Sequence, residues 1–75
     1  MSTDLNNILV FKTNIQTETD RLLVQPTLDS HTCISQWNID QHDIDCVLRV
    51  VTSTLTPQQV ISVIRQHGFD CAELE

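Results

Sequence analysis

The segment from Thr56 to Gly68 carries the local signals that most restrict how this chain can fold. Thr56 suits the N-cap of a helix, Pro57 suits the first helical position, and Gln59 completes a capping box with Thr56. Gly68, the only glycine in the chain, suits the left-handed position just past a helix end. Apolar residues recur at helical spacing between these ends. The segment therefore predicts an amphipathic helix over residues 57–67.

Short runs rich in β-branched and aromatic residues surround this helix and predict strands. Ile34 is out of phase with the later apolar residues of its run, which indicates an irregular strand start. Cys46, Leu48 and Val50 fall on one face of the third run, because side chains alternate along a strand. The expected strands cover residues 7–11, 33–40, 46–51 and 69–74.

Another helix is expected between the first two strands. Thr17 and Asp20 resemble a capping box, and Glu18 adds negative charge at the positive end of the helix dipole. Pro26 would remove one hydrogen bond and crowd the preceding turn, at a cost of about 3 kcal/mol. We therefore expect this helix to kink or end at Pro26, near Gln25. Its apolar side consists of Leu22, Leu23, Val24 and Leu28.

The order of these elements is strand, helix, strand, strand, helix, strand. With right-handed crossovers it predicts an α+β, ferredoxin-like βαββαβ fold, in which one four-stranded antiparallel sheet has two helices on one face. The first and third strands are expected to be central, and the second and fourth to be edges. With 75 residues, the chain allows a single domain over residues 1–75 and no second core.

The charge balance is strongly acidic, because 10 Asp and Glu residues oppose 4 Lys and Arg residues for a net charge of −6. Nucleic acids and anionic membrane surfaces are polyanions, so this sign argues against both as partners. No apolar run reaches the roughly 18 residues of a membrane span. Residues 1–7 lack the basic start and apolar stretch of a secretory signal. We therefore expect a cytoplasmic protein.

Motifs for catalysis are not evident in the sequence. A chain with one glycine cannot build a glycine-rich phosphate loop, and neither Ser53 nor Ser62 lies in a nucleophile elbow. So small a domain also rarely offers the concave pocket that acid–base catalysis needs. We expect no enzymatic activity and no cofactor.

Several segments together resemble the heavy-metal-associated domain of copper chaperones and metal-pumping ATPases. Residues 56–71 look like the second helix of that family and its exit, where a glycine is followed by an aromatic residue and then by a small residue, here Cys71. The similarity covers residues 8–74 and implies the same ferredoxin-like fold and a place in a metal-handling family. The matching strand positions are Ile34, Trp37 and Ile39 in the second strand and Leu48 and Val50 in the third.

The loop before the first helix departs from that family, whose metal motif there is Met-x-Cys-x-x-Cys. Counted back from the helix, Thr17 and Asp20 take the cysteine places and Ile15 takes the Met place; counted forward from the strand, Gln16 and Thr19 take the cysteine places. Neither register supplies a thiol. Cu(I) is soft and prefers sulfur ligands, whereas hydroxyl, amide and carboxylate groups are hard. We expect a degenerate loop that does not bind Cu(I).

A true heavy-metal-binding protein or metallochaperone with other ligands is the alternative. Its candidate ligands are Cys33, Cys46, Cys71 and His42. The odd cysteine count and wide spacing argue against a disulfide framework or a zinc knuckle, so we interpret the cysteines as small buried residues. The carboxylates of residues 40–45 could bind a divalent cation, but without EF-hand spacing or a glycine we expect a solvated turn.

Trp37 is the sole tryptophan and falls on a predicted edge strand. We interpret it as a core side chain covered by a helix. Because tryptophan is common at interface hot spots and an edge strand can pair with another chain, a protein partner or a homodimer at this edge stays open. ACT-like small-molecule sensors share the strand order and form a third class. The function we expect first is that of a small interaction domain similar to the heavy-metal-associated domain.

Overall fold

The computed structural model describes residues 8–74, so residues 1–7, with the expected first residue of the first strand, and residue 75 lie outside the described part. The order of strands and helices agrees with the sequence prediction. The six elements are β1 (Ile8–Thr13), α1 (Glu18–Ser30), β2 (Gln36–Asp40), β3 (Val47–Val51), α2 (Pro57–Gln66) and β4 (Cys71–Glu73).

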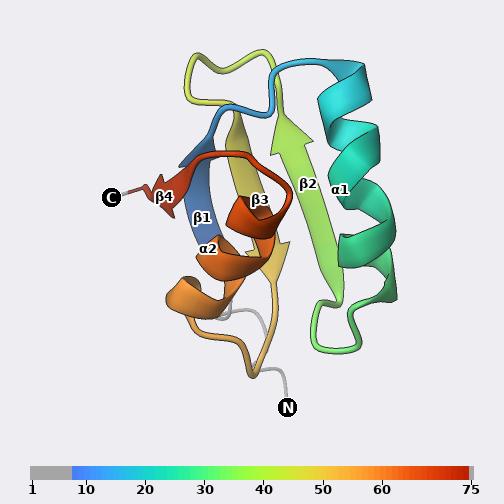
Figure 1. Ribbon diagram of the computed structural model, residues 1–75. Coiled ribbons are helices and arrows are strands. Elements are labelled where there is room, and N and C mark those ends of the chain that lie inside the picture. The colour runs from blue at the N-terminus through green and yellow to red at the C-terminus, as the bar shows by residue number, and fades with distance from the viewer. Residues whose placement is uncertain (1–7, 75) are drawn as a thin grey trace.

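The four strands form one antiparallel sheet in the order β2-β3-β1-β4. β1 and β3 are therefore central, and β2 and β4 are the edges, which confirms that prediction. Both helices cover the same face of the sheet, with α1 beside β2 (Figure 1) and α2 in contact with β4. This is the predicted ferredoxin-like architecture.

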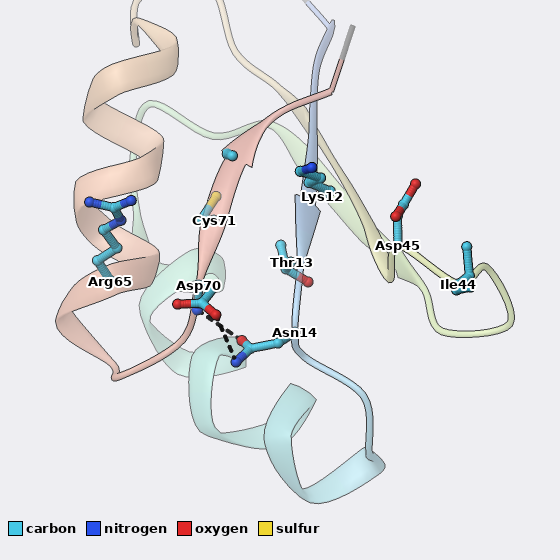
Figure 2. A pocket seen from close by; sticks show the side chains of 9 residues that line it. Lys12, Thr13, Asn14, Ile44, Asp45, Arg65, Asp70 and Cys71 are labelled. Carbon is cyan, nitrogen blue, oxygen red and sulfur yellow. Dashed lines mark hydrogen bonds between the residues drawn. The ribbon is translucent and has the colours of Figure 1, made fainter.

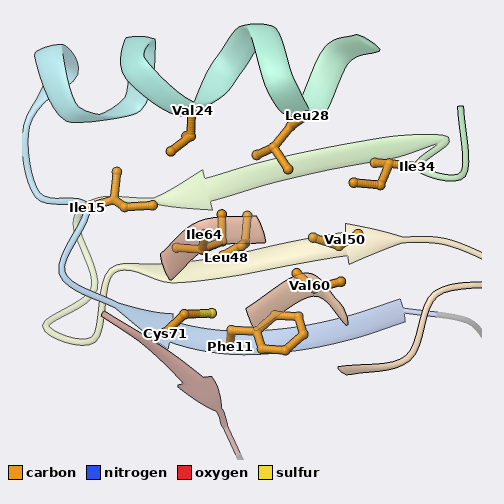
Figure 3. Packing of buried hydrophobic residues seen from close by; sticks show 10 residues of the cluster. All are labelled: Phe11, Ile15, Val24, Leu28, Ile34, Leu48, Val50, Val60, Ile64 and Cys71. Carbon is orange, nitrogen blue, oxygen red and sulfur yellow. The ribbon is translucent and has the colours of Figure 1, made fainter. Parts of the chain in front are cut away.

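The core lies between the sheet and the two helices (Figure 3). Phe11 of β1 and Leu48 of β3 are partners across the sheet, and both side chains are completely buried. Each helix buries one stripe of apolar side chains. Neither helix within residues 8–74 has the length and apolarity that a membrane crossing needs. The other core members are Ile15, Val24, Leu28, Ile34, Val50, Val60, Ile64 and Cys71.

Helix α1 runs through Pro26 to Ser30, so the expectation that the helix ends near Gln25 is wrong. Pro26 has no N–H for the carbonyl of Leu22, but both residues are exposed, so that carbonyl can accept from water. Tertiary contacts hold the last turn: Leu28 is buried in the core, and Thr27 Oγ1 lies 2.9 Å from His67 Nε2. Burying Leu28 is worth about 2 kcal/mol, which offsets much of the cost of the proline.

The apolar side expected for α1 is also narrower than the sequence suggests. Val24 and Leu28 are buried, whereas Leu22 is 52% exposed and Leu23 is 55% exposed. Helical geometry explains the difference, because residues four apart share a face and adjacent residues do not.

Three strands begin later than predicted. The N–H of Ile34 donates to the carbonyl of His31, which makes a turn, and β2 begins only at Gln36. Cys46 has a left-handed φ of 43°, which interrupts the extended backbone, so β3 begins at the next residue. β4 begins at Cys71, because residues 69 and 70 still form the connection from α2.

The caps of α2 formed as predicted. Gln59 N donates to Thr56 Oγ1 at 3.3 Å, and Thr56 N donates to Gln59 Oε1 at 2.9 Å. Gly68 follows the helix with φ 88°, in the left-handed region. Local side-chain chemistry therefore set both ends of this helix.

Candidate functional site

The loop between β1 and α1 is anchored by Thr13 at the end of β1. Thr13 N donates to the carbonyl of Asp45 at 2.9 Å, and Thr13 Oγ1 donates to the carbonyl of Cys46 at 2.8 Å. The same hydroxyl oxygen accepts from Ile15 N at 3.2 Å. Ile15 is completely buried, so the loop enters the core before it reaches the helix.

Thr17 and Asp20 form a complete capping box at the start of α1. Asp20 N donates to Thr17 Oγ1 at 3.0 Å, and Thr17 N donates to Asp20 Oδ2 at 3.3 Å. Asp20 Oδ2 also accepts from Gln16 N at 3.2 Å. The predicted cap is confirmed, and the polar atoms at this helix end are engaged with the backbone.

The remaining predicted loop residues, Gln16 and Thr19, have exposed side chains. The side chains of residues 16–20 therefore supply hydroxyl, amide and carboxylate groups, all hard ligands. This donor set does not fit Cu(I). It also fits a hard cation poorly, because the carboxylate of Asp20 already accepts two backbone N–H groups.

Gln41 is a residue of this site that sequence reasoning missed. Its Nε2 donates to the carbonyl of Thr17 at 2.7 Å and to that of Ile15 at 3.4 Å. The β2–β3 hairpin is thereby fastened to the loop. No local sequence pattern indicates this role, because Gln41 and Thr17 are 24 residues apart in the sequence.

The β2–β3 hairpin is stabilised by its own carboxylates. His42 N donates to Asp40 Oδ1 at 3.1 Å, and Asp45 N donates to Asp43 Oδ1 at 2.9 Å. The side chain of His42 is exposed. These contacts make the acidic residues turn formers, in line with the solvated turn expected from the sequence.

The three cysteines are free thiols in different surroundings. Cys46 and Cys71 are buried, whereas Cys33 is only half-buried, so the interpretation of all three as buried is wrong for Cys33. Burial, and after it the carboxylates of Asp43 and Asp45, raise the pKa of the Cys46 thiol. Burial raises the pKa of Cys71 to about 11. Both shifts disfavour the thiolate that binds soft metals.

The candidate ligands of the alternative hypothesis do not gather at one place. Within residues 8–74, no three His, Cys, Asp or Glu side chains converge into a group that could hold a metal ion. Cys33 lies in the turn before β2, Cys46 lies before β3, Cys71 begins β4, and His42 is on the hairpin.

A pocket of about 260 Å³ lies where β1, β4 and α2 meet the hairpin (Figure 2). Asn14 and Asp70 are joined beside it, since Asp70 N donates to Asn14 Oδ1 at 2.8 Å. Lys12 and Arg65 contribute positive charge to its lining. Its thiol, Cys71, is 2% exposed, so the pocket presents little sulfur to a ligand.

Trp37 is half-buried: it packs against the core without belonging to it and its indole reaches α1, so the interpretation as a core side chain holds only in part. Its indole Nε1 donates to Asp29 Oδ1 at 2.8 Å, and the guanidinium carbon of Arg21 lies 5.8 Å from the ring centroid. These contacts fix the ring against the helix and leave part of it exposed.

Known proteins resemble this chain in structure more than in sequence. No protein-family model matches it, and no curated protein matches it. Among solved structures, it is similar to the copper(I)-loaded form of the first domain of the human copper chaperone for SOD1, CCS. The TM-score is 0.76 with 18% identity, over 88% of this chain and 89% of that chain. The chain therefore has the fold of the heavy-metal-associated domain, as the sequence resemblance implied.

Proposed function

We propose that this protein is a small interaction domain with the heavy-metal-associated fold, whose β1–α1 loop does not carry Cu(I). The observation that carries this proposal is the capping box of Thr17 and Asp20, which occupies the loop where that family places its thiols. A loop whose polar groups close a helix end has no soft ligand to offer.

The register of the degenerate motif belongs to the same proposal. Ile15 is completely buried, while Thr17 and Asp20 hydrogen-bond to each other's backbone across the helix start. These positions match the count made back from the helix, in which Ile15 replaces the Met and the other two replace the cysteines. Gln16 and Thr19 point outward as exposed residues. We therefore assign the lost thiol positions to Thr17 and Asp20.

The proposal places the domain in the cytoplasm, without a catalytic role. Three free thiols in 75 residues suit a reducing compartment. The acidic net charge of −6 favours protein partners over nucleic acid and anionic membranes.

Competition for Cu(I) tests the metal half of the proposal. Native untagged protein is titrated, under reducing and anaerobic conditions, into Cu(I) held by the chromophoric chelator bicinchoninate. We expect the colour of the chelate to persist at several equivalents of protein. The matched positive control is the variant Thr17→Cys with Asp20→Cys, which should remove copper from the chelator.

Withdrawal of one equivalent of copper by the native protein would contradict the proposal. The variants Cys33→Ser and His42→Ala would then identify the ligands. Loss of uptake in either variant would establish the alternative, a metal-binding protein with unusual ligands.

A further inference from the structure

The pocket where β1, β4 and α2 meet the hairpin supports an inference about a small ligand, which is independent of the function proposed above. We propose that this pocket binds a free aliphatic α-amino acid in its zwitterionic form. Arg65 would hold the carboxylate of the ligand, Asp45 would hold its ammonium group, and Ile44 would contact its side chain.

The lining of the pocket is balanced in charge, unlike the chain as a whole. It holds two of the chain's four Lys and Arg residues but only two of its ten Asp and Glu residues. The pocket is therefore formally neutral in a protein whose net charge is −6. A ligand with a single charge would meet a like charge in this lining, whereas a zwitterion can place each of its charges against an opposite one. The four charged residues are Lys12, Arg65, Asp45 and Asp70.

Each side of the pocket carries both signs of charge (Figure 2). Arg65 of α2 and Asp70, just before β4, form one side, and Lys12 of β1 and Asp45 of the hairpin form the other. Burial raises the pKa of Cys71, and the guanidinium of Arg65 partly opposes that rise, so Arg65 lies near the start of β4. A zwitterion held by Arg65 and Asp45 would therefore join the two sides of the pocket.

The two carboxylates differ in how free they are to bind a ligand. Asp70 Oδ2 accepts from Asn14 Nδ2 at 3.5 Å, and Asp70 N donates to Asn14 Oδ1 at 2.8 Å. Asp45 is held through its backbone, because its N–H donates to Asp43 Oδ1 and its carbonyl accepts from Thr13 N. The half-buried side chain of Asp45 can therefore accept from the ammonium group of a ligand without giving up either bond.

The two cations also differ. The planar guanidinium of Arg65 can donate two parallel N–H bonds to one carboxylate, whereas the ammonium of Lys12 acts as a point charge. Arg65 therefore suits the carboxylate of an amino acid better, and Lys12 adds attraction from the opposite side.

The size of the pocket and its apolar part restrict the ligand further. A volume of about 260 Å³ lies just below the roughly 300–1,000 Å³ of pockets that take drug-sized ligands, so a smaller molecule fits. Ile44 lines the pocket and is 93% exposed, more than any other large apolar side chain within residues 8–74. Contact with an aliphatic side chain would remove part of this surface from water.

Titration of the ¹⁵N-labelled full chain with L-leucine tests this inference. We expect saturable amide shifts concentrated at residues 12–14, 44–45 and 70–72. L-Leucinamide lacks the carboxylate and N-acetyl-L-leucine lacks the ammonium group, so each should bind at least tenfold more weakly than L-leucine. Glycine keeps both charges without the aliphatic side chain, so it should shift the same amides at higher concentrations.

Matched variants locate the two charges and the apolar contact. Arg65→Gln and Asp45→Asn should each weaken L-leucine binding at least tenfold. Arg49→Gln and Glu18→Gln make the same charge changes at exposed positions outside the pocket and should leave the affinity within twofold. Ile44→Ala should weaken the binding of L-leucine and leave that of glycine unchanged, because glycine has no side chain to contact it.

Several results would overturn the inference. An absence of saturable shifts with L-leucine, or shifts centred outside the pocket, would refute binding at this place. Equal affinity for L-leucinamide, for N-acetyl-L-leucine or for inorganic phosphate would show that the pocket does not select a zwitterion. Equal weakening by Arg65→Gln and Arg49→Gln would show that only the overall charge of the protein matters.

Discussion

The double replacement Thr17→Cys with Asp20→Cys most directly tests the proposal that these two residues occupy the cysteine places of the family's metal motif. In the metal-free state it removes three hydrogen bonds at the start of α1, at 3.0, 3.3 and 3.2 Å. Loss of a threonine cap alone costs about 1 kcal/mol, and exposed bonds to a carboxylate add a similar amount. We expect the free energy of unfolding to fall by about 2 kcal/mol.

Copper should reverse this loss. The two new thiols would lie at a helix N-terminus, where the dipole lowers thiol pKa values and favours the thiolate. A ligand present at a hundredfold excess over its Kd stabilises the folded state by about 2.7 kcal/mol. Cu(I) should therefore return the variant to at least the stability of the parent, while the parent itself should not respond.

Urea unfolding followed by the fluorescence of Trp37 measures both effects, and chelator competition measures the affinity. The control is Gln16→Cys with Thr19→Cys, which changes two exposed side chains and leaves the capping box intact. Its metal-free stability should stay within about 0.5 kcal/mol of the parent. If this control binds Cu(I) tightly and the first variant does not, the register is wrong and the reasoning from the capping box fails.

Three other predictions concern stability. Gly68→Ala should lower the free energy of unfolding by about 1–2 kcal/mol. The cause is the φ of 88° alone, because nothing lies within 4 Å of an added Cβ. Gly68→Asn should lower it less, and an unchanged melting temperature for the alanine variant would contradict the left-handed cap. Pro26→Ala should raise the free energy of unfolding by about 1–3 kcal/mol, since the new N–H can bond the carbonyl of Leu22; a lower Tm would show that the proline is not strained. Burial raises the pKa of Cys71 from 9.0 to about 11, so the unfolded chain ionises first and the protein should lose about 2 kcal/mol as pH rises from 9 to 11. Urea midpoints measured across that range should show a smaller decline in Cys71→Ala, and parallel curves would refute the linkage.

Local signals in the sequence were enough to predict the fold. The capping residues Thr17 and Thr56 and the left-handed Gly68 act within one turn of chain, so their chemistry can be interpreted without knowing what packs on them. The order of the elements, with right-handed crossovers, placed β1 and β3 at the centre of the sheet. The absence of thiols from residues 14–20 was likewise visible in the sequence, because it is a matter of residue identity.

What depended on contacts between distant segments could not be predicted. Helix α1 passes Pro26 because Leu28 is buried in the core and Thr27 contacts His67, forty residues away. Gln41 holds the loop across 24 residues of sequence, and no periodic pattern marks such a bond.

The sequence by itself therefore determined the order of the elements, the start of each helix, the end of α2 and the lack of sulfur in the loop, because each arises from neighbouring residues. The tertiary structure alone decided that α1 continues past its proline and that Gln41 fastens the β2–β3 hairpin to the β1–α1 loop. These features follow from how surfaces made by separate segments fit together, and their energies exist only once the chain has folded.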